Sequence, residues 1–352
     1  YTYYAQAVDN RGLTSDAATT THVVDNSDPT VEIVNVSPDP RSETVRSITI
    51  RFSEPVTGFD IADLSLKRNS GPNLLTSQSL TSADGGVTWT LSSGTTLAPV
   101  AGNYVLSLSA SGSGITDLAG NLLTSGDSDS WRQNALVVSR LTFYNQSNFD
   151  GYTPDATAND DIAIAADKTA LLPGNKATFA NITSYDKGIN GVIIDMWGLV
   201  ATPTAADFQF RVGRTGDPSR WPAAPAPTSI LRRPGRGEDD SDRIMITWAK
   251  GAIRNQWLRV TVLANANTGL SSSDVFYFGN LAGEAGNVFP TSTEARVTAF
   301  DVADVRRNYS PVNNVLVTNR WDFNRDGRVN ALDLVIARAS YQRDSLNLLD
   351  AP

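Results

Sequence analysis

The sequence predicts a mainly β protein that ends in a short α-helical region. Ser, Thr, Asn, Asp and Gly are abundant, and turn-forming residues recur about every 8–12 residues between short alternating runs of apolar and polar residues. This spacing is typical of antiparallel sandwiches. Near the C-terminal end, an apolar stripe follows the i, i+3, i+4, i+7 pattern of a helix: Leu332, Val335, Ile336 and Ala339.

Composition narrows the class of protein. The 352 residues carry a net charge of −8 with a pI of about 4.8, which argues against nucleic acid or an anionic membrane as partner. The chain has no cysteine, no signal peptide and no apolar run long enough for a transmembrane helix. It opens on Tyr-Thr-Tyr-Tyr, which is typical of the middle of a strand. We therefore expect a fragment of a longer, extracellular product.

Residues 1–28 are predicted to form a hairpin, with strand candidates at 1–8 and 19–24. A two-stranded hairpin is marginal by itself. The segment is interpreted as the end of a truncated Ig-like or fibronectin-III-like domain, or as an element that completes another sheet. His22 is the only histidine, and we interpret it as structural rather than catalytic.

Residues 29–138 contain a second set of strand candidates and two recognisable runs. Phe52-Ser-Glu-Pro-Val56 and Ile115-Thr-Asp-Leu-Ala-Gly-Asn121, in this order and at this distance, resemble bacterial Ig-like domains of large secreted and surface-layer proteins. The resemblance implies an Ig-like sandwich with a spacing or adhesive role. Trp89 and Trp131 are expected to fill its core.

Residues 139–280 hold roughly eight strand candidates separated by long polar loops, which predicts a jelly-roll-like β-sandwich. One alternative for this segment is a carbohydrate-binding or targeting region of a secreted polysaccharide-active enzyme. That alternative requires exposed aromatic side chains along one face: Tyr144, Tyr152, Trp197 and Trp221. The acidic run 235–242 is interpreted as a solvated loop.

The segment from Asp322 to Asp333 matches the twelve-residue calcium loop D-x-[DN]-x-[DN]-G-x5-[DE]. Calcium takes oxygen ligands at about 2.3–2.6 Å, and alternate residues of such a loop point inward. Gly327 allows the sharp turn that a Cβ resists. The predicted calcium ligands are Asp322, Asn324, Asp326, the backbone carbonyl of Arg328, Asp333, and Asn330 directly or through water.

A weaker copy of this pattern lies 32 residues upstream, where residues 295–309 align with 327–341. The identical pairs are Arg296/Arg328, Val297/Val329, Ala299/Ala331, Asp301/Asp333, Arg306/Arg338 and Tyr309/Tyr341. Two loop–helix units near the C-terminal end resemble a type I dockerin over about residues 280–350. The resemblance implies a small α-helical, calcium-stabilised module (residues 281–352) of EF-hand type that docks onto a cohesin.

The first copy departs from the dockerin pattern in its ligands. Pro290, Ser292 and Glu294 replace the first three oxygen donors. Glu284 and Asn287 are candidate replacements in a longer loop. A calcium-bound and a metal-free first copy therefore both stay open.

The contact positions also depart from the pattern. Dockerins present a Ser-Thr pair to cohesin, and here the places hold Ala331-Leu332 and Ala299-Phe300. An alanine beside a large apolar side chain suits a dry interface. We therefore expect the two helices to pack on the 139–280 sandwich, with an exposed docking module as the alternative.

No catalytic pattern is present: the sequence lacks H-E-x-x-H, P-loop and dinucleotide fingerprints, and its acidic clusters are interpreted as solvated loops. The sequence predicts a non-catalytic C-terminal region of a large extracellular bacterial surface or adhesive protein. Its partners would be calcium and either a cohesin-like protein, a neighbouring subunit or a polysaccharide. A subunit of an extracellular fibre is a further alternative.

Overall fold

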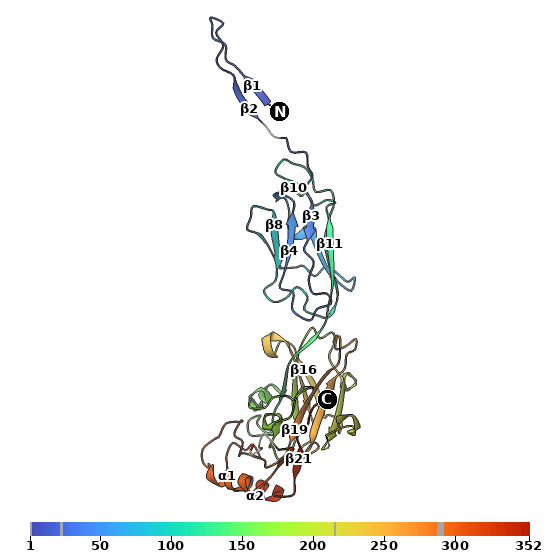
Figure 1. The fold of residues 1–352 in the computed structure, drawn as a ribbon, viewed down its shortest axis with the longest axis vertical. Coiled ribbons are helices and arrows are strands. Elements are labelled where there is room, and N and C mark those ends of the chain that lie inside the picture. Colours follow the sequence, from blue (N-terminus) through green and yellow to red (C-terminus); the bar gives the residue numbers. More distant parts are fainter. Residues whose placement is uncertain (1, 22–23, 215, 287–291) are drawn as a thin grey trace. The chain divides into compact units, whose positions relative to one another are not determined.

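The structure is a computed structural model that describes every residue except 1, 22–23, 215 and 287–291. It divides into two compact units, Tyr1–Gln133 and Asn134–Pro352 (Figure 1). The second unit contains the predicted sandwich together with both C-terminal helices. Residues 139–280 and 281–352 thus fold as one compact unit.

The first unit begins with an antiparallel hairpin, β1 (Thr2–Ala5) and β2 (Ala18–Thr21). All four residues of β1 are exposed, including the large side chains of Tyr3 and Tyr4. His22 lies outside the described residues.

Two antiparallel sheets form the Ig-like part of this unit. In the first sheet the strands follow the order β3 (Val31–Ile33), β4 (Ser47–Phe52), β8 (Thr88–Ser92) and β7 (Ser79–Ser82). The second follows the order β11 (Asp127–Gln133), β9 (Gly102–Leu108) and β6 (Leu64–Arg68). Short strands β5 (Val56–Thr57) and β10 (Thr116–Asp117) pair with each other, and η1 (Ile61–Asp63) precedes β6.

The core of the Ig-like part forms because alternate residues of both sheets point inward. Ile48, Ile50 and Phe52 alternate along β4 with more exposed residues, and Leu106 and Leu108 do the same on β9. Trp131 is buried and stacks on Tyr104, with 5.4 Å between ring centroids. Trp89 is partly buried against the same cluster. The expectation that both tryptophans belong to the core is confirmed.

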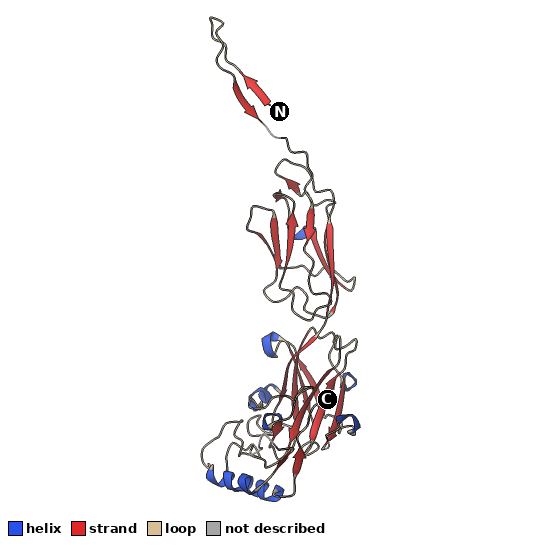
Figure 2. Ribbon diagram, in the orientation of Figure 1, coloured by secondary structure: helices blue, strands red, loops and turns tan. Residues whose placement is uncertain are grey.

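The second unit contains a sandwich of two four-stranded sheets (Figure 2). The order in one sheet is β12 (Leu136–Thr142), β14 (Gly191–Trp197), β17 (Asp242–Thr247) and β16 (Ser229–Arg233). In the other it is β13 (Ile182–Thr183), β19 (Asp274–Asn280), β18 (Trp257–Val262) and β15 (Phe208–Gly213). Five short 3-10 helices connect strands: η2 (Ala158–Ala163), η3 (Phe179–Asn181), η4 (Ala205–Asp207), η5 (Pro218–Arg220) and η6 (Glu238–Asp240).

Apolar clusters also cover the outer surfaces of this sandwich. Beyond the central core, Trp257 and Tyr277 pack with Leu346 and other residues from the C-terminal tail. Tyr144 and Trp221 are 1% and 2% exposed, so they do not lie on an open aromatic face. The carbohydrate-binding alternative is therefore wrong about these two residues, whereas Tyr152 is 54% exposed and Trp197 is partly exposed.

The C-terminal part of the unit contains α1 (Ala299–Arg307) and α2 (Ala331–Ser340), with β20 (Glu294–Arg296) paired to β21 (Ser345–Asn347). The predicted apolar stripe of α2 faces the core only at Ile336, since Leu332 and Val335 are each 58% exposed. Asp333, Ala337 and Ser340 form the buried side instead. A carboxylate drawn inward at the first turn sets the orientation of the helix.

Of the helices in the described residues, none combines the length and the apolar character needed to cross a bilayer.

Candidate metal centre and helix surface

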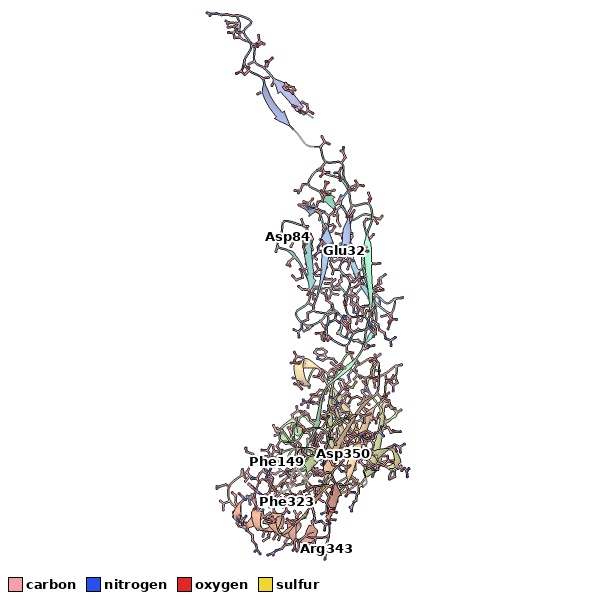
Figure 3. All side chains as sticks on the ribbon, in the orientation of Figure 1. Glu32, Asp84, Phe149, Phe323, Arg343 and Asp350 are labelled. Atoms are coloured by element: carbon pink, nitrogen blue, oxygen red, sulfur yellow. The ribbon has the colours of Figure 1, made fainter. Side chains whose placement is uncertain are left out.

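The predicted calcium loop begins at Asp322 and reaches α2 through a sharp turn. Gly327 has φ +84°, and a Cβ at this position would lie 3.0 Å from the side-chain nitrogen of Asn148. Phe323, labelled in Figure 3, is fully buried beneath the loop. The carboxyl groups of Asp322 and Asp333 are also fully buried, at opposite ends of the loop. Local backbone and packing therefore hold the loop as the spacing predicts.

Asp322 organises the first half of the loop. Its two carboxylate oxygens accept hydrogen bonds from the backbone N–H groups of Asp326 (3.2 Å) and Gly327 (3.0 Å). The side-chain nitrogens of Asn324 and Asn330 each donate to Oδ2 of Asp326, both at 3.1 Å. The loop thus draws four of the six predicted ligands together. The Arg328 side chain is exposed.

Asp333 joins the loop to the helix. Its Oδ1 accepts from the N–H of Phe323 (2.7 Å), and its Oδ2 accepts from the N–H of Asn330 (2.9 Å). Asn330 is the N-cap of α2, where its Oδ1 accepts from the N–H of Leu332 at 2.7 Å. These two residues form a reciprocal capping box. The loop motif indicates ligands, but it gives no sign of this second role.

Burial raises the pKa of the two carboxyl groups at the ends of the loop, Asp322 and Asp333. It raises the pKa of Asp322 to about 7, while nearby Arg325 acts in the opposite direction. Burial also raises the pKa of Asp333, although backbone N–H groups partly offset the effect. A cation at the centre of the loop would favour the ionised form of both groups.

The loop residues fit a calcium ion by donor chemistry. All the predicted side-chain ligands offer oxygen, which hard cations prefer. In the described part of the chain, neither Asp322 nor Asp333 forms a salt bridge, although both are fully buried. Together with Asp326 they supply three negative charges, one more than a divalent cation neutralises.

Arg325 ties the loop to the sandwich, and sequence reasoning missed it. The side chain is 1% exposed, and its backbone has φ +53°. One guanidinium nitrogen donates to the backbone oxygens of Asn319 and Asp322, and the other donates to Tyr144 Oη at 2.9 Å. Backbone bonds reinforce the junction, because Asp186 N–H donates to Phe323 O at 2.9 Å. From the sequence, an arginine at this loop position is expected to be exposed to solvent. Only the fold shows that Arg325 contacts Tyr144.

The first copy reproduces part of the same geometry. Asp301 Oδ1 accepts from the N–H of Ala285 and Oδ2 accepts from the N–H of Thr298, both at 2.7 Å. These bonds match those that Asp333 makes, so fully buried Glu284 takes the place that Asp322 has in the second copy. Asn287 and Pro290 lie outside the described residues. Ser292 and Glu294 precede or belong to β20, where Glu294 pairs with Arg296.

The two helices fold in one compact unit with the sandwich, as expected, but Phe300 and Leu332 do not form the contact. Phe300 is 62% exposed and Leu332 is 58% exposed. The opposite sides of both helices carry the buried carboxylates of the loops, which is why these apolar side chains face outward.

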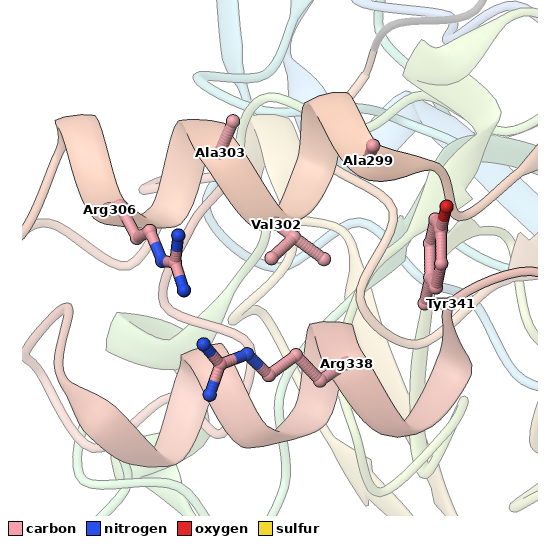
Figure 4. Close-up of a pocket in the computed structure, with 6 residues that line it drawn as sticks. All are labelled: Ala299, Val302, Ala303, Arg306, Arg338 and Tyr341. Atoms are coloured by element: carbon pink, nitrogen blue, oxygen red, sulfur yellow. The ribbon is translucent and has the colours of Figure 1, made fainter.

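A groove of about 320 Å³ runs between α1 and α2 (Figure 4). Its lining comes from both copies of the repeat: Ala299, Val302, Ala303, Arg306, Arg338 and Tyr341. Arg306 and Arg338 extend toward each other across the groove (Figure 4). Neither arginine has a salt-bridge partner within the described residues. The groove therefore combines apolar walls with two uncompensated positive charges.

A second acidic group lies in the Ig-like part. Among the residues that the structure describes, one set of three carboxylates brings its oxygens within 4.8 Å of one another: Asp25, Glu54 and Asp117. Glu54 belongs to the FSEPV run and Asp117 to the ITDLAGN run. Burial raises the pKa of Glu54, and the two neighbouring carboxylates act in the same direction. The sequence signal was an acidic residue in each run, which we interpreted only as a family signature.

Comparison with known proteins supports part of the sequence interpretation. Residues 25–135 match the family model described as a bacterial Ig-like domain. Among curated proteins, none matches the chain.

Several solved structures show weak similarity. The chain is similar to the N-terminal part of the bacterial S-layer protein SbsC, with 16% identity and a TM-score of 0.22, over 72% of this chain and 44% of that one. It therefore spans less than half of that structure. Native alpha-2-macroglobulin from Escherichia coli, in a fragment spanning domains MG0-NIE-MG1, gives 9% identity and a TM-score of 0.29, over 76% of both chains. A titin pair of tandem Ig domains gives 10% identity and a TM-score of 0.23, over 72% of this chain and 96% of that one. The matched model thus supports the Ig-like part of the sequence interpretation, at residues 25–135.

Proposed function

We propose that the chain is a non-catalytic region of an extracellular bacterial surface protein whose two C-terminal helices dock onto a protein partner. The observation that carries this proposal is the open outer surface of α1 and α2. Phe300, Leu332 and Val335 are exposed there, beside a groove that holds two uncompensated arginines. Large apolar side chains around a positively charged groove are typical of a surface that another protein covers.

The chemistry of the groove indicates the kind of partner. Within the described residues Arg306 and Arg338 form no salt bridge, so a partner that places a carboxylate between them gains charge-assisted hydrogen bonds. The apolar residues around them suit an aliphatic surface on the partner. We infer a cohesin-like protein with an acidic residue at the centre of an apolar contact face. A second copy of this chain, as in a fibre, is the competing occupant.

Calcium has a structural role in this proposal. When bound, the ion neutralises the loop carboxylates; the chain's own residues then hold α2 in place. Asp333 connects the loop to the first turn of α2, and Arg325 connects the loop to Tyr144 in the sandwich. The exposed surface is thereby held rigidly on the sandwich. Rigid presentation reduces the entropy lost on binding.

The experiment measures binding of purified cohesin domains, including those of surface proteins, to the immobilised chain by surface plasmon resonance. We expect Leu332→Asp to weaken binding at least tenfold without changing the melting temperature. Val312→Asp is the matched control, because Val312 is 83% exposed and lies outside both helices. Arg338→Glu should also weaken binding. An unchanged affinity in Leu332→Asp would exclude this surface.

Sedimentation of the chain alone tests the competing occupant. If the surface binds a second copy, wild type self-associates at micromolar concentration and Leu332→Asp is monomeric. That outcome would replace the cohesin-like partner by a neighbouring subunit.

A further inference from the structure

Two buried carboxyl groups lie together outside the calcium loop. Asp150 lies between β12 and η2, whereas Asp160 lies within η2, and both side chains are 0% exposed. The two carboxyl groups are in direct side-chain contact. Two ionised carboxylates in contact repel each other strongly in a low-dielectric interior. Such a pair needs a bound cation or a shared proton.

The backbone leaves one oxygen of this pair unused. Oδ1 and Oδ2 of Asp150 accept from the N–H groups of Tyr152 (2.9 Å) and Gln146 (2.6 Å). Oδ2 of Asp160 accepts from the N–H of Thr157 at 2.6 Å and caps η2. Within the described residues, Oδ1 of Asp160 is completely buried and accepts no hydrogen bond from an N–H or hydroxyl group, whereas the Asp160 carboxyl itself lies in hydrogen-bonding contact with Asp150. An orphaned, buried carboxylate oxygen is rare in native proteins.

The nearby cationic groups in the described residues form no salt bridge with the pair. Asp161, the next residue, forms salt bridges with Arg233 and Arg243, so those guanidinium groups are already occupied. Lys187 is the remaining cationic group near Asp150, and its Nζ donates to Gln146 O. Within the described residues, no salt bridge reaches Asp150 or Asp160. Burial raises the pKa of both carboxyl groups, as is expected when the charged form lacks a partner.

We propose that Asp150 and Asp160 bind a divalent cation of the calcium type, at a site separate from the loop at 322–333. The free Oδ1 of Asp160 supplies the first ligand, and the adjacent Asp150 carboxylate supplies the second. Oxygen donors alone favour a hard cation over zinc. Gln146 and Tyr152 flank the pair with φ near +60°, at 59° and 61°. The cation offsets the repulsion that otherwise opposes this compact loop.

The site supports the calcium loop from the other side. Asn148, two residues before Asp150, donates its N–H to Arg325 O at 2.9 Å. The segment that carries the carboxyl pair therefore contacts the residue that anchors the loop. A cation at Asp150 and Asp160 would stabilise the junction between sandwich and helices.

The test counts calcium equivalents by calorimetry on the full chain at pH 7.5. We expect Asp160→Asn to bind one equivalent fewer than wild type. Asparagine keeps an acceptor for the Thr157 N–H, so the cap of η2 survives. The matched control is Asp155→Asn, which removes the same charge from an exposed position of the same segment and should keep the full count. Asp150→Asn, which also keeps an acceptor, provides a second variant, and circular dichroism checks that each variant folds.

A shared proton is the explanation that would overturn the proposal. Asparagine imitates a protonated carboxyl group, so Asp160→Asn would then bind as many equivalents as Asp155→Asn. A separate variant, Asp326→Ala, removes a predicted ligand of the loop at 322–333. The calcium equivalents that it loses therefore measure binding at the loop alone. Either site can therefore fail while the other is retained.

Discussion

The guanidinium carbon of Arg325 lies 4.2 Å from the centroid of the Tyr144 ring, and both side chains are buried. Tyr144 follows β12 of the sandwich, whereas Arg325 belongs to the calcium loop. The pair combines a cation–π contact with the hydrogen bond to Tyr144 Oη. The pair directly joins the predicted calcium loop to the sandwich.

Replacing Arg325 should weaken the whole second unit. Lysine lacks the planar guanidinium group of arginine. In Arg325→Lys the backbone oxygens of Asn319 and Asp322 therefore have fewer hydrogen-bond donors. We expect a loss of about 1–3 kcal/mol in the free energy of unfolding, measured by urea denaturation in calcium. Arg328→Lys, at an exposed neighbouring position, should change stability little. Equal stability of the two variants would contradict the role assigned to Arg325.

Calcium removal should destabilise the second unit through the loop. An ion that binds only the folded state adds about 2.7 kcal/mol at a hundredfold excess over its Kd. Asp326→Ala removes one anionic ligand, so the melting temperature of this variant should respond less to calcium than that of wild type. Asp350→Ala is the control, because Asp350 is exposed and lies outside the loop. Calorimetry that finds no loss of calcium binding in Asp326→Ala would rule out the loop assignment.

Lys168 should make stability depend on alkaline pH. Burial lowers its pKa from 10.5 to about 8, despite the adjacent Asp167. Between these two values the unfolded chain binds more protons than the folded chain, so stability rises as pH increases from about 8 toward 10.5. The total effect is on the order of 3 kcal/mol.

The measurement compares wild type with Lys168→Met by chemical denaturation between pH 8 and 9.5. Methionine fills a similar volume without a charge, so the stability of this variant should not rise with pH in this range. Lys176→Met is the control, since Lys176 is exposed in the same unit and should leave the slope unchanged. Parallel pH profiles for wild type and Lys168→Met would contradict the prediction.

Trp131→Ala should destabilise the Ig-like domain selectively. The indole is 2% exposed and stacks on Tyr104, so its removal leaves a large cavity. We expect a loss of about 3–5 kcal/mol in the free energy of unfolding. Differential scanning calorimetry of the chain should show one transition shifted downward, with the other retained. Loss of both transitions would mean that the two units do not unfold separately.

The sequence predicted features that depend on local spacing. The FSEPV and ITDLAGN runs indicated the Ig-like domain, and the order of oxygen-bearing residues predicted the loop that begins at Asp322. Both features could be predicted because the residues that form each of them are close in the chain or belong to one small domain. The calcium ligands themselves stay a prediction.

Features that depend on distant contacts were not predictable. The periodicity of α2 gave an apolar stripe, but nothing in the sequence showed that Asp333, rather than Leu332 and Val335, would be drawn inward. Arg325 and Tyr144 are 181 residues apart, so their contact carries no local signal. The same applies to the carboxyl pair in the second unit, because acidic residues in a polar loop are usually solvated.

The pairing of β20 with β21 has a mechanical consequence. Residues 294–296 and 345–347 form an antiparallel ladder, and Trp257 Nε1 donates to Asn347 O at 2.8 Å. Both helices and the calcium loop belong to the segment between these strands. Tension along the backbone therefore passes across the ladder from one strand to the other, and the enclosed segment carries no load until the ladder breaks. A pulled chain would keep α1 and α2 folded up to that force.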